Sequence, residues 1–237
     1  MKIPRLLIPS LILAATLLGC GAQEKTPAAP TVSTGTLWLK ASEGDAEALA
    51  ELRVRAEKGE ATAQLNLGVM YEYGQGVAKD EVEAVKWYRK AADQGDADAQ
   101  SNLGVMYRTG QGVAKDEVEA VKWYRKAADQ GYATAQYILG LCYAHGEGVA
   151  MNEGEAVKWY RKAADQGHSN AQVNLGSRYY NGAGVAKNEV EAYKWFLLSA
   201  PQGNVLAMQK IQLIEKDLTA SQRAEGQRLA REWKSKK

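Results

Sequence analysis

The chain has few of the residues that build disulfide frameworks and metal sites. Its 237 residues include two cysteines, Cys20 and Cys142, so a disulfide framework is excluded. They also include two histidines, His145 and His168, and neither stands in a metal-ligand spacing such as H-E-x-x-H. We therefore expect no metal site and no cofactor.

The sequence also lacks the short motifs that mark common catalytic sites. It contains no nucleophile elbow, no P-loop and no GxGxxG motif at the start of a βαβ unit. Glycine-rich turns do recur, but the repeats described below make them connections between helices. We expect no catalytic residues and a non-enzymatic protein.

Charge gives no sign of a nucleic-acid partner. The whole chain has 30 basic and 28 acidic residues, and without Lys2 and Arg5 the two numbers are equal. These two basic residues belong to an amino-terminal segment that we expect to be removed. A neutral chain without a basic patch gives no reason to expect binding to nucleic acid.

Residues 1–19 are typical of a signal peptide. Two basic residues precede an apolar run, Leu6–Leu18, which is too short to span a bilayer. The run ends in Leu-Leu-Gly-Cys, which resembles the bacterial lipobox, in which the cysteine is lipidated and becomes the first mature residue. The resemblance implies lipidation of Cys20, and several acyl chains on one residue anchor a protein stably. In the lipobox a smaller residue is usual at the position of Leu18. Ordinary secretory cleavage near Ala22, without lipidation, therefore remains an alternative.

The segment after the cysteine predicts how the protein is held at the membrane. Gly21 lacks the aspartate that favours inner-membrane retention in enterobacterial-type lipoproteins, so the resemblance implies an outer-membrane lipoprotein facing the periplasm. Residues 20–36 are rich in proline, alanine, threonine and glycine and have no periodicity. This composition predicts a flexible tether. Membrane contact is expected through the lipid anchor only.

The rest of the chain is organised by an internal repeat of 36 residues. The sequence EAVKWYRKAADQG occupies Glu83–Gly95, Glu119–Gly131 and Glu155–Gly167, and a looser copy occupies Glu191–Gly203. A fixed period of this length indicates a solenoid. The repeats defined by this period are residues 61–96, 97–132, 133–168 and 169–204.

Each repeat predicts two helices joined by a tight turn. The first helix, as in Ala61–Tyr73, places its apolar residues within an arc of about 100°, which should face the second helix. Gly68 in its middle favours the close approach of a neighbouring helix, because glycine is otherwise unfavourable there. The second helix begins at a capping box such as Asp80/Glu83 and ends before a glycine such as Gly95.

The repeats resemble a known family. The pattern A-x-A-Q-x-x-L-G-x-x-Y-x-x-G-x-G-V, followed by E-A-x-K-W-Y-x-K-A-A-x-Q-G, is similar to the Sel-one-like repeat (SLR), a relative of the tetratricopeptide repeat. The match extends over residues 61–204 in four copies. It implies an all-α fold, an α-solenoid of helix-turn-helix repeats with a right-handed superhelix. SLR proteins mostly act as adaptors or scaffolds, so the partner implied is a protein or peptide, and we expect a monomer.

Both flanks of the repeats are expected to be caps that cover an apolar end of the stack. Residues 37–60 predict a divergent pair of short helices, and residues 205–237 predict carboxy-terminal capping helices. Pro201 should end the fourth repeat's second helix early. The last helix should then begin after the capping box Thr219/Gln222 and lie over Leu197 and Leu198.

Differences between repeats indicate where a partner would bind. Repeats one and two differ at five of 36 positions, and four of the five lie in one arc of the first helix, opposite its buried stripe. In the tetratricopeptide relatives, residues at the corresponding positions of the first helix line the concave groove, and the resemblance implies the same here. Polar positions of the second helix, such as Lys86 and Arg89, are identical in repeats one to three, so exposure alone does not explain the variation. Recent duplication followed by patchy drift remains an alternative.

The predicted partner-binding groove takes five positions from each first helix. Mixed aromatic, aliphatic and charged groups suit a surface that holds a peptide or a protein edge. The best anchors are Tyr73, Arg108, Tyr137 and Tyr180. The full set is Thr62, Leu65, Val69, Glu72, Tyr73, Asp98, Ser101, Val105, Arg108, Thr109, Thr134, Tyr137, Leu141, Ala144, His145, Asn170, Val173, Ser177, Tyr180 and Asn181.

Other recurring residues are interpreted as scaffold. The tryptophans Trp87, Trp123, Trp159 and Trp195 repeat with the period and should be packing residues. Cys142 stands where earlier repeats have methionine, which predicts a buried hydrophobic side chain. Two other functions were weighed: a surface-exposed or secreted effector that binds a host protein, and a β-lactam-binding or hydrolysing enzyme. The latter is described for SLR proteins with paired cysteines in each repeat, which this chain lacks.

Overall fold

The computed structural model describes residues 32–235, and the part from Ser33 onward forms one unit of packed helices. The predicted signal peptide, Cys20 and the tether up to residue 31 lie outside the described residues. The predicted tether extends too far, because the first helix begins at Thr34 and not at residue 37. The hydroxyl oxygen of Ser33 accepts a hydrogen bond from the Thr36 backbone amide at 3.2 Å, which starts this helix early.

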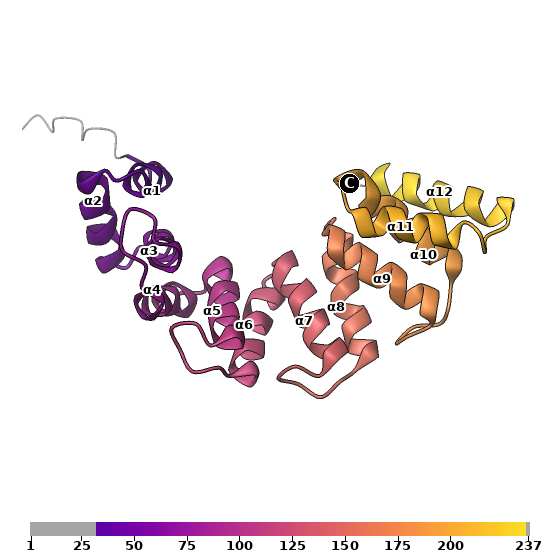
Figure 1. Cartoon of the computed structure of the whole chain (residues 1–237), viewed down its shortest axis with the longest axis horizontal. Helices are drawn as coiled ribbons and strands as arrows, with labels where there is room; N and C mark the ends of the chain where they lie inside the picture. Colours follow the sequence, from indigo (N-terminus) through magenta and orange to yellow (C-terminus); the bar gives the residue numbers. More distant parts are fainter. Residues whose placement is uncertain (1–31, 236–237) are drawn as a thin grey trace, which may run out of the picture. The chain divides into compact units, whose positions relative to one another are not determined.

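The described residues are all-helical, as predicted, with no strand among them (Figure 1). The four repeats are the helix pairs α3–α4, α5–α6, α7–α8 and α9–α10, and each helix packs against the next in the chain. This is an α-solenoid with a period of 36 residues. The helices are α1 (Thr34–Ser42), α2 (Ala46–Glu57), α3 (Ala61–Tyr73), α4 (Glu81–Asp93), α5 (Ala97–Thr109), α6 (Glu117–Asp129), α7 (Ala133–His145), α8 (Glu153–Asp165), α9 (Ser169–Asn181), α10 (Glu189–Ser199), α11 (Val205–Ile214) and α12 (Ala220–Ser235), with a 3₁₀ turn at Ala200–Gln202.

The second helices begin at the predicted caps, but only half of each capping box forms. The Asp80 carboxylate accepts a hydrogen bond from the Glu83 amide at 3.0 Å. The Asp80 amide donates to the Tyr71 carbonyl at 2.9 Å, and the Glu83 carboxylate pairs with Lys86 at 2.8 Å. The Asp80 amide, which would bond to the Glu83 side chain in a complete capping box, is therefore bonded to the preceding helix instead. The glycine Gly95 has φ +94°, the left-handed conformation expected at a helix end.

The two helices of a repeat approach closely at a glycine and an aromatic ring. A Cβ atom placed on Gly104 would lie 2.6 Å from Cε1 of Tyr124, and Tyr124 is fully buried. Gly68, Gly140 and Gly176 meet the corresponding aromatic residue of their own repeats in the same way. The prediction that these glycines allow a close helix approach is therefore confirmed.

A ladder of glutamine pairs, each made of one buried and one exposed glutamine, joins each repeat to the one before it. Gln100 donates from Nε2 to the Ala92 carbonyl at 3.1 Å, and its Oε1 accepts from Gln130 at 2.8 Å. Gln130 in turn donates to the Gly95 carbonyl at 2.9 Å. Because buried polar groups are costly unless they are paired, these bonds fix how neighbouring repeats meet. The glutamine ladder consists of Gln64, Gln100, Gln136 and Gln172 with Gln94, Gln130, Gln166 and Gln202.

Charged residues of the second helices also contact the next repeat. Arg89 donates a hydrogen bond to the Tyr107 hydroxyl, and Arg125 and Arg161 do the same to Tyr143 and Tyr179. On the same helices a lysine lies over each tryptophan ring, as in Lys126, whose Nζ is 3.7 Å from the centre of the Trp123 ring. The invariance of these residues in repeats one to three therefore has a structural explanation.

The core holds the residues that the sequence assigned to it. The four recurring tryptophans are buried, and so is Cys142, which packs with residues of α6 and α8. Burial raises the pKa of the Cys142 thiol to about 11, so the thiol is protonated and unreactive near neutral pH.

Both ends of the stack are covered by helices. α2 takes the place of a second helix, because its Ala56 carbonyl accepts from Gln64 at 2.9 Å as Ala92 does from Gln100. At the other end α12 packs on α10, and the Trp233 and Trp195 rings meet edge to face at 6.2 Å. Leu198 is buried in this cluster and Leu197 is half-buried against it, as predicted.

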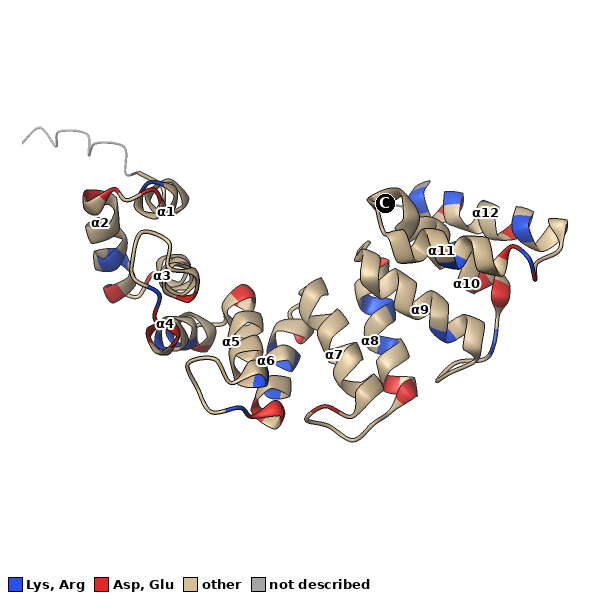
Figure 2. Ribbon diagram, viewed as in Figure 1, with Lys and Arg blue, Asp and Glu red and all other residues tan. Residues whose placement is uncertain are grey.

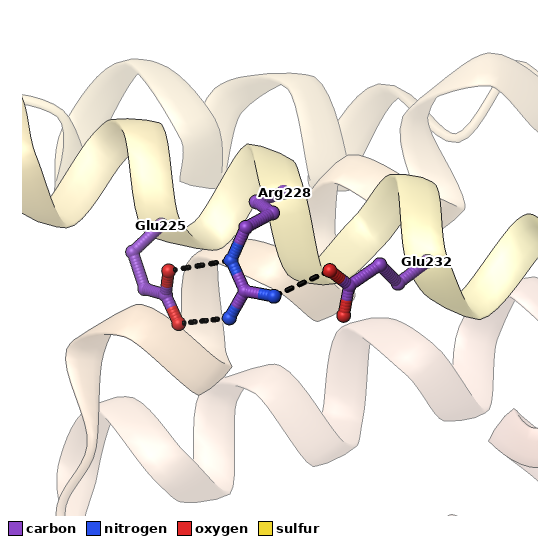
Figure 3. A network of polar contacts seen from close by, with 3 residues as sticks. All are labelled: Glu225, Arg228 and Glu232. Atoms are coloured by element: carbon purple, nitrogen blue, oxygen red, sulfur yellow. Dashed lines mark hydrogen bonds and ion pairs between the residues drawn. The ribbon is translucent and has the colours of Figure 1, made fainter.

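The outer face of α12 carries a small ion-pair network (Figure 3). Arg228 donates from Nε and Nη2 to the two oxygens of Glu225 at 2.9 and 2.7 Å, and from Nη1 to Glu232. All three side chains are exposed, so the network adds little to stability. The predicted capping box at the start of α12 does form in full, between Thr219 and Gln222.

A substitution at the glycine–tyrosine contact tests the close approach of the helices. We expect Gly104→Ala to lower the free energy of unfolding by about 1–3 kcal/mol, because the buried Tyr124 ring has no room to move. Gly154→Ala is the matched control: Gly154 is also helical, but its nearest new contact is 3.4 Å away. It should raise stability by up to about 1 kcal/mol. Urea denaturation measures both, and equal stability of the two variants would contradict the packing described.

Candidate functional site

The twenty predicted groove residues all lie on the first helices α3, α5, α7 and α9. Their exposure varies. Eight are exposed: Thr62, Tyr73, Asp98, Thr109, Thr134, His145, Asn170 and Asn181. Nine are half-buried: Leu65, Val69, Glu72, Val105, Arg108, Tyr137, Leu141, Ser177 and Tyr180.

Three of the predicted groove residues are too deeply buried to present a surface. Ser101 is 5% exposed, Ala144 6% and Val173 2%. The reason is that one edge of each first helix packs against the neighbouring repeat: Leu65 and Val69, for example, lie against the core cluster of α4 and α5. The arc predicted to be open surface is therefore partly an inter-repeat contact, and for these three residues the expected exposure is wrong.

The four predicted anchors differ in what already holds them. Tyr73 is 65% exposed, the highest fraction among the large hydrophobic residues of the first helices. Tyr137 stacks on the His168 ring at 4.7 Å. The Tyr180 hydroxyl donates to Asp217 at 2.9 Å. Nε of Arg108 is buried.

The first helices carry little charge (Figure 2). α7 has no lysine, arginine, aspartate or glutamate, whereas α8, the second helix of the same repeat, has six. Low charge with tyrosine and arginine present is the composition that distinguishes the centre of a protein–protein interface from ordinary surface.

A pocket of ≈ 410 Å³ opens between α7, α8 and α9. Five of its lining residues were predicted from the sequence, and three were not. The predicted residues are Tyr137, Leu141, His145, Ser177 and Asn181; the additional ones are Tyr160, Asn174 and Arg178.

Arg178 is the most informative residue that sequence reasoning missed. It stands at the position of Met70, Met106 and Cys142 in the earlier repeats, all of which are buried. Its Nη1 lies 2.5 Å from Oε2 of Glu153 at the start of α8. The signal was present in the sequence, because an arginine interrupts an otherwise apolar column.

Tyr160 lies deep in the pocket and belongs to a row of buried tyrosines on the second helices. Burial raises its pKa, while hydrogen bonds to its oxygen from Asn174 and Arg178 oppose this shift. It keeps its proton at neutral pH. The pKa of the nearby His168 is lowered by burial, so this ring is neutral, and its Nδ1 accepts from the Ala171 amide at 3.2 Å.

The described part of the chain lacks two other kinds of feature, a metal-binding cluster and a membrane-spanning helix. Residues 32–235 contain no group of three or more His, Cys, Asp or Glu side chains placed to hold a metal ion. Within the same range, none of the helices combines the length and the apolar character needed to cross a bilayer.

Comparison with known proteins bears directly on the repeats. The family model described as Sel1 repeat matches residues 61–96, 97–132, 133–168 and 169–204, which together form more than half of the chain. These bounds are the same as those given by the 36-residue period. No curated protein matches the chain.

Solved structures with the same fold come from several bacteria. The protein c5321, a protective antigen present in uropathogenic Escherichia coli strains and displaying an SLR fold, is 35% identical over 86% of this chain, with a TM-score of 0.74. The match covers 46% of that protein, so this chain spans less than half of its length. A Sel1 repeat protein from Oxalobacter formigenes is 39% identical, with 75% of this chain and 73% of that chain covered and a TM-score of 0.70.

A third structure shows likeness of fold alone. The immunity protein Pa5087 from Pseudomonas aeruginosa is 23% identical over 89% of this chain and 82% of its own, with a TM-score of 0.50. Sel1 repeat proteins generally mediate protein–protein interaction. On the four repeat matches and on its likeness to the Oxalobacter protein, the chain belongs to the Sel1 repeat family.

Proposed function

We propose that this protein is a non-enzymatic scaffold or adaptor that docks a protein or peptide on its first helices. One observation carries the proposal. The invariant arginines of the second helices bond to the next repeat, whereas four of the five positions that differ between repeats one and two lie on the first helices. Five of the predicted groove residues line the pocket. First helices that vary between repeats, carry little charge and leave most of the predicted positions at least partly exposed are suited to partner recognition.

The proposal extends to the cell envelope. Lipidation of Cys20 would anchor the protein in the outer membrane, with the solenoid facing the periplasm and residues up to 33 as a tether. The support is the sequence of residues 1–21 alone. On this proposal the partner is an envelope protein.

A second candidate function is a surface-exposed effector that binds a host protein. It is favoured by one relative, since c5321 of Escherichia coli is described as a protective antigen. Protease treatment of intact cells separates the candidates. Loss of the protein from intact cells would support surface display, and survival until the outer membrane is permeabilised would support the periplasmic scaffold.

Substitution of exposed first-helix residues tests the docking surface. We expect the double variant Tyr73→Ala/His145→Ala to capture less of the native partner than the wild type after crosslinking in the envelope, because both side chains are exposed on the proposed surface. The control variant Lys86→Ala/Lys158→Ala changes two exposed residues of second helices and should capture as much as the wild type. Quantitative mass spectrometry of the captured proteins gives the comparison. Equal capture by both variants would contradict the proposed surface.

Removal of the lipidated residue tests the anchor. We expect Cys20→Ser to move the protein from the membrane fraction to the soluble periplasmic fraction, since no acyl chain could then be attached. Fractionation with immunoblotting measures the shift, and mass spectrometry of the wild-type amino terminus reports the acyl chains directly. An unmodified terminus near Ala22 would show ordinary secretory cleavage instead.

A further inference from the structure

In repeats one to three, the buried tyrosine of the second helix lies near a different residue in each repeat. In repeat one the Tyr88 hydroxyl donates to Oε2 of Glu72 at 2.5 Å. Burial raises the pKa of Tyr88, and the hydrogen bond to Glu72 raises it further, so this hydroxyl keeps its proton. The chain itself supplies the carboxylate that accepts this hydrogen bond.

Repeat three has the same tyrosine but no such acceptor. The position of Glu72 is taken by Ala144, which is too short to reach the Tyr160 hydroxyl, and the pocket lies above that tyrosine. The corresponding residue in repeat two is Arg108, whose charge lowers the pKa of Tyr124 against the effect of burial. Repeat three is therefore the one in which this tyrosine lines a pocket of ≈ 410 Å³ and has no carboxylate at the position of Glu72.

The pocket wall around Tyr160 holds hydrogen-bond donors and no carboxylate among its lining residues. Asn174 and Arg178 line the pocket together with Tyr160, and both lower the pKa of Tyr160 against the effect of burial, as hydrogen-bond donors do. Arg178 uses Nη1 for Glu153, at 2.5 Å, and a guanidinium has five N–H donors in all. Ser177 and Asn181 add further polar groups to the wall.

We propose that this pocket binds a carboxylate of the partner, held where the carboxylate of Glu72 lies in repeat one. Tyr160 donates the hydrogen bond, and Arg178 supplies the positive charge. Tyr137 and Leu141 contact the aliphatic carbons next to the carboxylate. This inference rests on the proposed docking function and names the chemical group that is recognised.

Other contacts in the chain favour a carboxylate over other acceptors. Besides Tyr88, Tyr180 donates to Asp217 at 2.9 Å and Tyr193 donates to Glu215 at 2.5 Å. A phosphate would bring more negative charge close to Glu153, with Arg178 as the single fixed cation in the wall. A cationic group would meet Arg178 directly. The Arg178–Glu153 pair leaves the site with little net charge, so binding of a small probe should be weak.

The carboxylate could come from an aspartate or glutamate side chain or from the end of a peptide. Two pairs of probes separate these sources: acetyl-Gly-Glu-Gly-amide against its Gln analogue, and acetyl-Gly-Gly-Gly with a free carboxylate against its amide. We expect at least one acid to shift the backbone NMR signals of Ser177 and Arg178 in the full-length ¹⁵N-labelled protein at millimolar concentration. Its amide partner should bind at least tenfold more weakly. Equal binding of acid and amide in both pairs would overturn the proposal.

Two variants tie the binding to this pocket. Ala144→Glu supplies a carboxylate within the chain, as repeat one does, and should abolish binding of the acid. Val82→Glu adds the same charge at an exposed position of the second helix α4 and should leave binding within twofold of the wild type. Tyr160→Phe removes the donor and should weaken binding at least fivefold; it should fold, since repeat four has Phe196 at this place. Unchanged binding by Ala144→Glu would show that the acid binds elsewhere.

The same Ala144→Glu variant separates failure of this inference from failure of the proposed function. If it captures the native partner as well as the wild type does, docking stands and the carboxylate site is wrong. If the wild type captures no partner while the acid probe still binds, the docking function fails and the chemistry of the pocket stands.

Discussion

The contact between a glycine of the first helix and an aromatic ring of the second is the constraint on which the rest of the structure depends. Because Gly104 has no side chain, the Tyr124 ring can lie against the helix backbone, and the two helices come close enough to bury it. The same contact carries the tyrosine hydroxyl of repeats one to three toward the residue at the position of Glu72. The same tyrosine therefore serves packing and, in the proposed carboxylate pocket, recognition. Its ring fills the core, and the hydroxyl of Tyr160 lines the pocket.

Much of the fold could be predicted from the sequence because the repeat multiplies each local signal. The Asx caps, the left-handed glycines and the mid-helix glycine each occur four times at fixed spacing, and the structure confirms them. The glutamine ladder was not predicted, although Gln64 and Gln94 recur just as regularly. Their bonds cross between helices, and the angular position of a residue on its own helix does not reveal what a neighbouring helix places beside it.

The candidate site was predicted in part for the same reason. Five of the predicted residues of α7 and α9 line one pocket, but Ser101 and Val173 are buried. Tyr160 and Arg178 were missed because both stand at positions that are buried in the other repeats. Arg178 departs from the residues at its position in the three earlier repeats, whereas the predicted groove follows positions that differ between repeats one and two. The invariance of Arg89, which favoured a functional interpretation of that variation, is explained by its bond to Tyr107.

The glutamine ladder has a consequence for how the length of the solenoid can change. Every junction uses the same donor, the same carbonyl and the same bridging amide, from Gln64 on Ala56 to Gln172 on Ala164. Deletion or insertion of a whole 36-residue repeat would therefore bring together two repeat surfaces that already form this contact elsewhere in the chain. The number of repeats, and with it the extent of the recognition surface, is thus open to unequal recombination in steps of one unit.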